Sequence, residues 1–200
     1  MKRRNIYWRK LANIDFMKYQ NLSLVLPCYN LEKIIYQNIK TVHEYLASQF
    51  GEHQIIVVND GSVDATQAEL EKARHDFGIT VVHYPENRGK GYAVRQGVAR
   101  AKYEIVGFLD ADLIIPMHEL AVFVESIESG YDLAIASRLR PGGRVSIPVP
   151  QHRLLMEKIF RCLRIMIIGV SKVRDTQCGC KFFTKKVAED LFPLMRVNRF

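Results

Sequence analysis

The sequence predicts a single α/β domain in which a mostly parallel sheet is flanked by helices. Short apolar runs alternate along the chain with segments of helical period, which is the pattern of parallel strands joined by crossover helices. Polar motifs follow the apolar runs, at the carboxyl ends of the expected strands, where open parallel sheets bind ligands. The chain has 200 residues, 48% of them hydrophobic and 25% charged, so one domain can bury a full core.

The first half of the chain is expected to form three strands and two helices. Each expected strand is a short apolar run bounded by polar residues. These strands are 22–27 ("LSLVLP"), 54–60 ("QIIVVND") and 79–84 ("ITVVHY"). Helical patterns cover 32–48 and 64–75, and the second opens with "DATQ", in which Asp64 and Gln67 have the spacing of a capping box.

The second half continues the alternation. After "PENRGKG", small and apolar residues recur at helical spacing: Ala93, Val94, Gly97, Val98 and Ala101. A fourth strand is expected at 103–112 ("YEIVGFLDAD"), and Pro116 is placed to open a helix at 116–129. A fifth strand follows at 131–138, and the Gly/Pro-rich stretch 138–150 is expected to be a flap or connector within the same domain.

The chain is basic, with 29 Lys and Arg against 21 Asp and Glu and a net charge of +8. Such a balance favours polyanionic partners such as phosphorylated substrates or anionic lipid headgroups, although a generally basic surface gives the same count. We expect no nucleic-acid partner, because the basic residues do not interleave with aromatic stacking positions. The four cysteines (Cys28, Cys162, Cys178 and Cys180) lack zinc-site spacing and are expected to be thiols in a reducing compartment.

Three segments define the expected organisation and location. Residues 1–21 form a basic leader without the apolar run of a signal peptide, and 22–200 form the domain. No stretch reaches the about 20 apolar residues of a spanning helix, so we expect a cytoplasmic chain in peripheral contact with a membrane. Residues 151–174 mix apolar and basic positions as an amphipathic helix on an anionic membrane surface does, or as a core helix with a solvated basic face does.

Two acids close the fourth expected strand. Asp110 and Asp112 follow a buried apolar run, where paired carboxylates are costly without a cation. A turn beginning at Asp110 would let both reach one ion, and Mg²⁺ or Mn²⁺ binds such acids together with phosphate oxygens. The alternative is that the pair caps the helix that begins near Pro116.

Two further motifs follow other strands. Asp60 ends the second strand and is a candidate ligand for a base or ribose hydroxyl, although Asp-Gly also makes turns. In "PENRGKG", Gly89 and Gly91 accompany Arg88 and Lys90 at an expected helix N-terminus, which suits a phosphate or sugar-diphosphate.

The first strand is followed by "PCYNLE". Tyr29 could stack on a nucleobase, and Glu32 could accept from its ring N–H. The alternative is a turn residue followed by an acid at the start of a helix.

Taken together, "LPCYN", "VVNDGSVDAT", "NRGKGYAV", "FLDADL" and "DTQCGCKFF" resemble the motifs of the family-2 inverting glycosyltransferases of the GT-A fold. The resemblance covers residues 22–200 and is closest to the polyprenyl-phosphate transferases of the dolichyl-phosphate β-glucosyltransferase type. It differs from the family at position 31. The family often has a Glu directly after the Asn, whereas here Leu31 follows Asn30 and the Glu comes one position later, as Glu32. Ile114 also stands where some relatives have a metal-binding Gln, and relatives usually continue beyond "RVNRF".

The resemblance implies three groups of site residues. Nucleotide contacts are expected from Pro27, Tyr29, Asn30, Glu32, Asp60, Lys90 and Asp110. The catalytic and metal-binding acids are expected to be Asp110 and Asp112. The sugar and acceptor contacts are expected from Arg138, Gln177 and Lys181.

The implied reaction is attack of an acceptor on the anomeric carbon of a nucleotide-sugar, UDP-glucose or a similar donor, with a nucleoside diphosphate leaving and Mg²⁺ or Mn²⁺ as cofactor. A polyprenyl-phosphate acceptor is ionised near neutral pH, since its second pKa is about 6, and needs no general base. A saccharide hydroxyl would need one, and Asp175 is the obvious candidate. A transferase acting on a saccharide hydroxyl and a non-catalytic nucleotide-sugar or membrane-binding module both remain alternatives.

Overall fold

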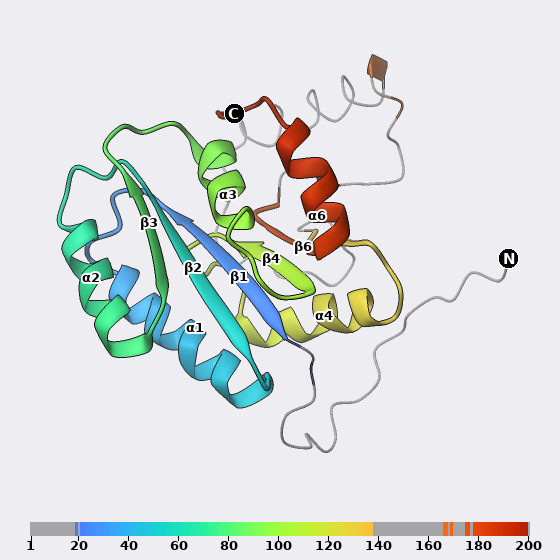
Figure 1. Ribbon diagram of the computed structural model, residues 1–200, viewed down its shortest axis with the longest axis horizontal. Coiled ribbons are helices and arrows are strands. Elements are labelled where there is room, and N and C mark those ends of the chain that lie inside the picture. The colour runs from blue at the N-terminus through green and yellow to red at the C-terminus, as the bar shows by residue number, and fades with distance from the viewer. Residues whose placement is uncertain are drawn as a thin grey trace, which may run out of the picture.

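The computed structural model describes residues 19, 21–137, 166–167, 169, 175–176 and 178–199. Within these residues the centre is a six-stranded sheet of order β3-β2-β1-β4-β6-β5 (Figure 1). The strands are β1 (Leu22–Cys28), β2 (His53–Asp60), β3 (Thr80–Tyr84), β4 (Ile105–Leu109), β5 (Leu133–Ile135) and β6 (Cys180–Thr184). The helices are α1 (Ile35–Gln49), α2 (Thr66–Phe77), α3 (Lys90–Val98), α4 (Leu120–Glu128) and α6 (Lys185–Leu191), with 3₁₀ turns η1 (Met117–Glu119) and η2 (Phe192–Leu194).

The mostly parallel sheet is confirmed. β1 pairs in parallel with β2 and β4, and β2 pairs in parallel with β3. β6 was not expected as a strand: it lies between β4 and β5 and runs antiparallel to both. Because of this direction, the amino end of β6 lies at the same edge of the sheet as the carboxyl ends of the parallel strands.

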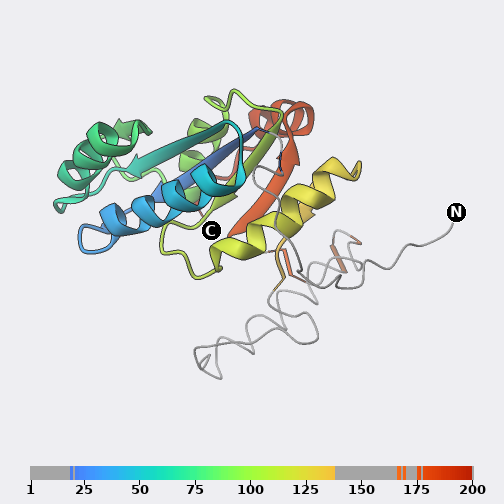
Figure 2. The ribbon, with the colours of Figure 1, turned by 90° about the horizontal axis from the view of Figure 1, so that it is seen from below.

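Helices cover both faces of the sheet. One hydrophobic cluster joins the sheet to α1, α2 and α4, and the other joins it to α3, α6 and η2. Figure 2 shows α1 and α4 on one side of the sheet and α6 on the other. Alternate residues of β1 supply the two clusters, Leu24 to the first and Val25 to the second, as the two-residue period of a strand requires. With both faces covered, ligands have access at the edge where the strands end.

The predicted capping box is wrong. The helix expected from residue 64 begins at Thr66, and Ala65, which precedes it, makes no side-chain cap. Asp64 Oδ1 instead accepts a hydrogen bond from Thr66 N at 3.0 Å. Gln67 turns toward the sheet, where its Oε1 accepts from Asn59 Nδ2 at 2.8 Å. The side chain that should have closed the box is therefore used to fix the end of β2.

Gly97 allows α3 to pack closely on the sheet. A Cβ at this position would lie less than 3.0 Å from Val25 Cγ1 and 3.1 Å from Val58 Cγ2, in the second hydrophobic cluster. We expect Gly97→Ala to lower the free energy of unfolding by about 1–3 kcal/mol, although Ala is about 1 kcal/mol better than Gly in a helix. Urea denaturation measures the change. Gly51→Ala, at a position with nothing within 4 Å, is the control; equal stability of the two variants would contradict this packing.

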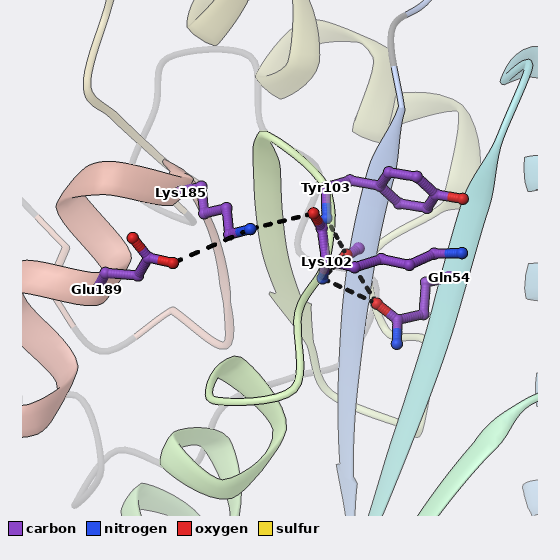
Figure 3. Close-up of polar contacts among 6 residues, drawn as sticks. Gln54, Lys102, Tyr103, Lys185 and Glu189 are labelled. Carbon is purple, nitrogen blue, oxygen red and sulfur yellow. Dashed lines mark hydrogen bonds and ion pairs between the residues drawn. The ribbon is translucent and has the colours of Figure 1, made fainter.

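A polar network fixes the opposite edge of the sheet. Ser23 Oγ donates to Gln54 Oε1 at 3.0 Å and accepts from the backbone N of Lys102 and of Tyr103, each at 3.1 Å. Figure 3 shows Lys185 reaching the same connection from α6, where its Nζ donates to Lys102 O at 3.2 Å. These bonds tie the segment between α3 and β4 to the starts of β1 and β2.

We expect the stability of this edge to depend on pH through His53. Burial lowers the pKa of His53, and the neighbouring His43 and Lys102 lower it further. The unfolded chain therefore binds a proton more readily than the folded one, so the stability due to neutral His53 is fully present above about pH 6.5 and is lost as the pH falls below it. We expect urea denaturation between about pH 8 and about pH 5 to show a steeper decline in the free energy of unfolding for the unaltered chain than for His53→Gln. Replacing the exposed His83 with Gln should leave the decline unchanged; identical pH profiles for His53→Gln and the unaltered chain would contradict the assignment.

Candidate functional site

The candidate residues gather at the edge of the sheet where the parallel strands end. β1 and β4 are neighbours in the middle of the sheet. After β1 the chain continues to β2 on one side, whereas after β4 it continues to β5 and β6 on the other side. Open α/β sheets bind ligands at such a switch point. Asp60 ends β2 at this edge, Asp110 and the loop between β3 and α3 follow strands there, and Gly179 precedes β6.

Asp110 and Asp112 lie on one turn, as expected. Leu113 N donates to Asp110 O at 3.1 Å, and Leu113 has a φ of 52°. Asp112 is exposed, and its Oδ1 accepts from Ile114 N at 3.3 Å. Neither acid caps the following helical turn, because η1 begins after Pro116 without a side-chain cap. The structure thus favours the turn over the capping alternative.

Asp110 has a cation on one side and a glycine on the other. Lys90, the first residue of α3, forms an ion pair with Asp110 Oδ1, and the two side chains are 33% and 37% exposed. Asp110 N donates to Gly179 O at 3.1 Å. A Cβ on Gly179 would lie 2.8 Å from Asp110 Oδ1 and closer still to Oδ2, so only glycine leaves room for this carboxylate.

Lys181 adds a second cation nearby. Its Nζ lies 5.4 Å from the centre of the Phe108 ring. Burial lowers the pKa of Lys181, and the positive charge of Lys90 lowers it further. Lys90 and Lys181 thus bring two positive charges near Asp110. Such a cluster attracts anionic oxygen atoms.

Asp60 organises the loop that presents Lys90. Asp60 is only 4% exposed. Its Oδ1 accepts from Tyr84 Oη at 2.7 Å and from Arg88 N at 2.9 Å, and its Oδ2 accepts from Gly89 N at 2.8 Å. Burial raises the pKa of Tyr84, and the hydrogen bond to Asp60 raises it further. The carboxylate therefore has a structural task; its expected contact with a base or ribose stays a prediction.

The amides expected to hold phosphate already have protein acceptors. Gly89 N donates to Asp60, and Gly91 N donates to Asn198 O at 2.9 Å. A Cβ on Gly91 would lie 2.5 Å from Val197 O. Both glycines thus let neighbouring protein groups approach. Of this motif, the side chain of Lys90 is the part that contacts Asp110.

The loops after β1 and β2 are tied together. Asn30 N donates to Ser62 Oγ at 2.9 Å, and Asn30 Oδ1 accepts from Val63 N at 3.0 Å. Glu32 Oε2 accepts from Ala65 N at 2.9 Å. These bonds make the two loops one unit and show a second task for Asn30 and Glu32 besides the predicted nucleotide contacts.

Other predicted residues are placed less directly. Tyr29 follows β1 and is 45% exposed, as a stacking ring would be, and Pro27 lies within β1, half-buried. Asp175 is buried, at 5% exposure. Arg138 and Gln177 lie outside the described residues, as do the segment 138–150 and most of the segments 1–21 and 151–174.

The described cysteines carry thiols, as predicted: Cys28, Cys178 and Cys180. Burial, followed by the charges of Asp64 and Asp60, raises the pKa of Cys28 to about 12. Burial also raises the pKa of Cys180. The thiolate is the nucleophilic and metal-binding form, so the raised pKa values disfavour either role for Cys28 and Cys180. Both side chains pack in the first hydrophobic cluster.

The acids fit a hard divalent cation in part. Among the described residues, no group of three or more His, Cys, Asp or Glu could by itself hold a metal ion. Mg²⁺ and Mn²⁺ sites often use one or two carboxylates and take the remaining oxygens from phosphate and water. The turn at 110–112 supplies such a pair, and the presence of Lys90 at Asp110 shows that a positive charge is favoured there.

Gly179, Tyr84 and Asn87 were not singled out from the sequence. Asn87 Nδ2 donates to Asp60 O at 3.1 Å, so it supports the same loop as Tyr84. A glycine flanked by two cysteines was the available signal for Gly179, but its neighbour Asp110 is 69 positions away in the chain.

Comparison with solved structures identifies the fold. The chain is similar to glucosyl-3-phosphoglycerate synthase from Mycobacterium tuberculosis in complex with Mn²⁺, UDP-glucose and glycerol 3-phosphate, with a TM-score of 0.63 and 23% identity. The match covers 84% of this chain and 57% of that one. The predicted GT-A architecture is thereby confirmed.

Curated relatives are similar over most of this chain. The dolichyl-phosphate beta-glucosyltransferase ALG5A of Trichomonas vaginalis is 32% identical over 90% of this chain and 58% of its own length. The dolichyl-phosphate beta-glucosyltransferase of Homo sapiens is 29% identical over 90% and 60%. The putative glycosyltransferase CsbB of Bacillus subtilis is 34% identical over 92% and 54%. The chain thus spans less than two thirds of the length of these relatives.

A family model described as "Glycosyl transferase family 2" matches residues 23–192. The match begins in β1, ends at the start of η2 and includes every strand of the described sheet.

Proposed function

Because the chain belongs to glycosyl transferase family 2, we propose that it moves a sugar from a nucleotide-sugar, UDP-glucose or a similar donor, to a polyprenyl phosphate, with inversion at the anomeric carbon. The main support is the turn that carries Asp110 and Asp112 at the end of β4, with Lys90 paired to Asp110. The relatives named dolichyl-phosphate beta-glucosyltransferases agree with this reaction.

The donor would bind across the ends of β1, β2 and β4. Tyr29 is 45% exposed and would stack on the base. Pro27, Asn30, Glu32 and Asp60 would lie around the nucleotide. Asp110 and Asp112 would hold Mg²⁺ or Mn²⁺, which when bound would neutralise charge that develops on the leaving diphosphate.

The lysines near Asp110 would bind anionic oxygens. Lys90 would contact the donor's diphosphate, and Lys181, with Arg138 and Gln177, would orient the transferred sugar or the acceptor phosphate. An ionised phosphate oxygen attacks without a general base. A phosphate acceptor therefore needs orientation and counter-charge, and the lysines beside Asp110 can supply both.

Peripheral membrane contact at the cytoplasmic face belongs to the same proposal. The basic and apolar residues of 151–174 suit an anionic leaflet. Met166 and Ile167 are helical and 75% and 78% exposed. Among the described residues, no helix combines the length and apolar composition needed to span a bilayer.

The test is product formation by the purified chain with UDP-glucose or other nucleotide-sugars, Mg²⁺ or Mn²⁺, and vesicles containing polyprenyl phosphate. We expect a glycolipid and release of UDP, both abolished by a chelator. Transfer only to a soluble oligosaccharide would instead support the second transferase hypothesis. Binding of the nucleotide without turnover on any acceptor would support the non-catalytic module.

A further inference from the structure

Asp110 is already neutralised by a cation of the protein. The ammonium of Lys90 contacts Asp110 Oδ1. A divalent ion bound at Asp110 would also need oxygen atoms of this carboxylate. An ammonium and a divalent ion repel each other at such short range. Both therefore compete for the same carboxylate.

The backbone around Lys90 is fixed, whereas its side chain is accessible. Asp60 holds the amides of Arg88 and Gly89, and Gly91 N donates to Asn198 O at 2.9 Å. The Lys90 side chain is 33% exposed. A flexible side chain on a fixed backbone can change partners without a rearrangement of the fold.

We propose that Lys90 is an exchangeable counter-cation: it pairs with Asp110 when no donor is present and transfers to a diphosphate oxygen when the metal-bound donor takes up Asp110. This inference rests on the proposed function and adds an order to it. Metal alone must displace Lys90 with no new partner for the ammonium, so it binds weakly. Metal together with a nucleoside diphosphate gives Lys90 a replacement anion, so the two bind cooperatively.

The test compares Lys90→Gln with the unaltered chain in binding experiments. We expect Lys90→Gln to bind Mn²⁺ about 10-fold more tightly in the absence of nucleotide, because the competitor is gone, and UDP about 10-fold more weakly in the presence of Mn²⁺. The electron paramagnetic resonance signal of unbound Mn²⁺ reports the first affinity, and calorimetry reports the second. Circular dichroism checks that the variant is folded.

Two further variants sharpen the comparison. Lys90→Arg keeps the charge and should bind Mn²⁺ within about 2-fold of the unaltered chain. Lys72→Gln removes an exposed lysine of α2 that pairs with Glu69, and should change neither affinity.

Mn²⁺ affinity that is unchanged or weaker in Lys90→Gln, without nucleotide, would overturn the exchange. If sugar transfer by the unaltered chain persists in that case, the proposed function stands. Failure of the unaltered chain to bind Mn²⁺ and UDP together would contradict both.

Discussion

Replacing Asp112 with Ala is expected to reduce sugar transfer at least about 100-fold, because loss of one group that stabilises developing charge costs about 10²–10³ in rate. The fold should survive, since Asp112 is exposed and its Oδ1 accepts a local hydrogen bond from Ile114 N. The rate of UDP release in the presence of Mn²⁺ and polyprenyl phosphate measures the loss.

The matched control is Asp190→Ala, which removes an exposed acid from α6. It changes the net charge equally and should keep the full rate. Equal rates for Asp112→Ala and Asp190→Ala would show that the exposed acid of the turn has no part in the reaction.

Gly179→Ala is expected to weaken Mn²⁺-dependent UDP binding about 100-fold, since displacements of about 1 Å can have effects of this size. The added Cβ would lie 2.8 Å from Asp110 Oδ1 and nearer to Oδ2, so the carboxylate must turn away. The variant would move the carboxylate of Asp110 from its observed position and would remove no ionisable group. Calorimetric titration of UDP with and without Mn²⁺ measures the effect.

Gly51→Ala is again the control, because a Cβ there meets nothing within 4 Å. It should bind UDP as the unaltered chain does. Unchanged binding by Gly179→Ala would mean that the carboxylate of Asp110 does not need its observed position.

The sequence was sufficient to locate the parallel strands and the acids. Each parallel strand is a continuous apolar run, because it is buried on both faces, and such runs are visible without knowledge of their partners. A polar role for Asp110 and Asp112 was predictable because they directly follow such a run, where charged groups need a partner.

The antiparallel strand β6 was not predictable in the same way. "CKFFT" is short, and its place between β4 and β5 depends on pairing with residues far away in the chain. The contacts of Gly91 with Asn198, and of Asp110 with Gly179, are of the same kind. Spacing along the chain reports faces of one element and does not report which distant segments meet.

The hydrogen bonds of Asp60 and Glu32 show a further limit. Carboxylates at strand ends suggested ligand contacts, yet in the structure both accept backbone N–H groups of neighbouring loops. Glycine-rich and Asp-Gly loops leave amides that need acceptors, and a nearby acid can meet that need before any ligand does. A residue type at a strand end therefore indicates a polar task without saying which one.

The most direct test of a metal site at Asp110 and Asp112 is the anomalous scattering of Mn²⁺ in crystals of the chain grown with Mn²⁺ and UDP. We expect an ion bound by the carboxylates of Asp110 and Asp112 and by the diphosphate of UDP, with Lys90 Nζ moved from Asp110 to the diphosphate. A nucleotide bound at the strand ends with no ion at these two acids, or an ion bound elsewhere on the chain, would contradict it.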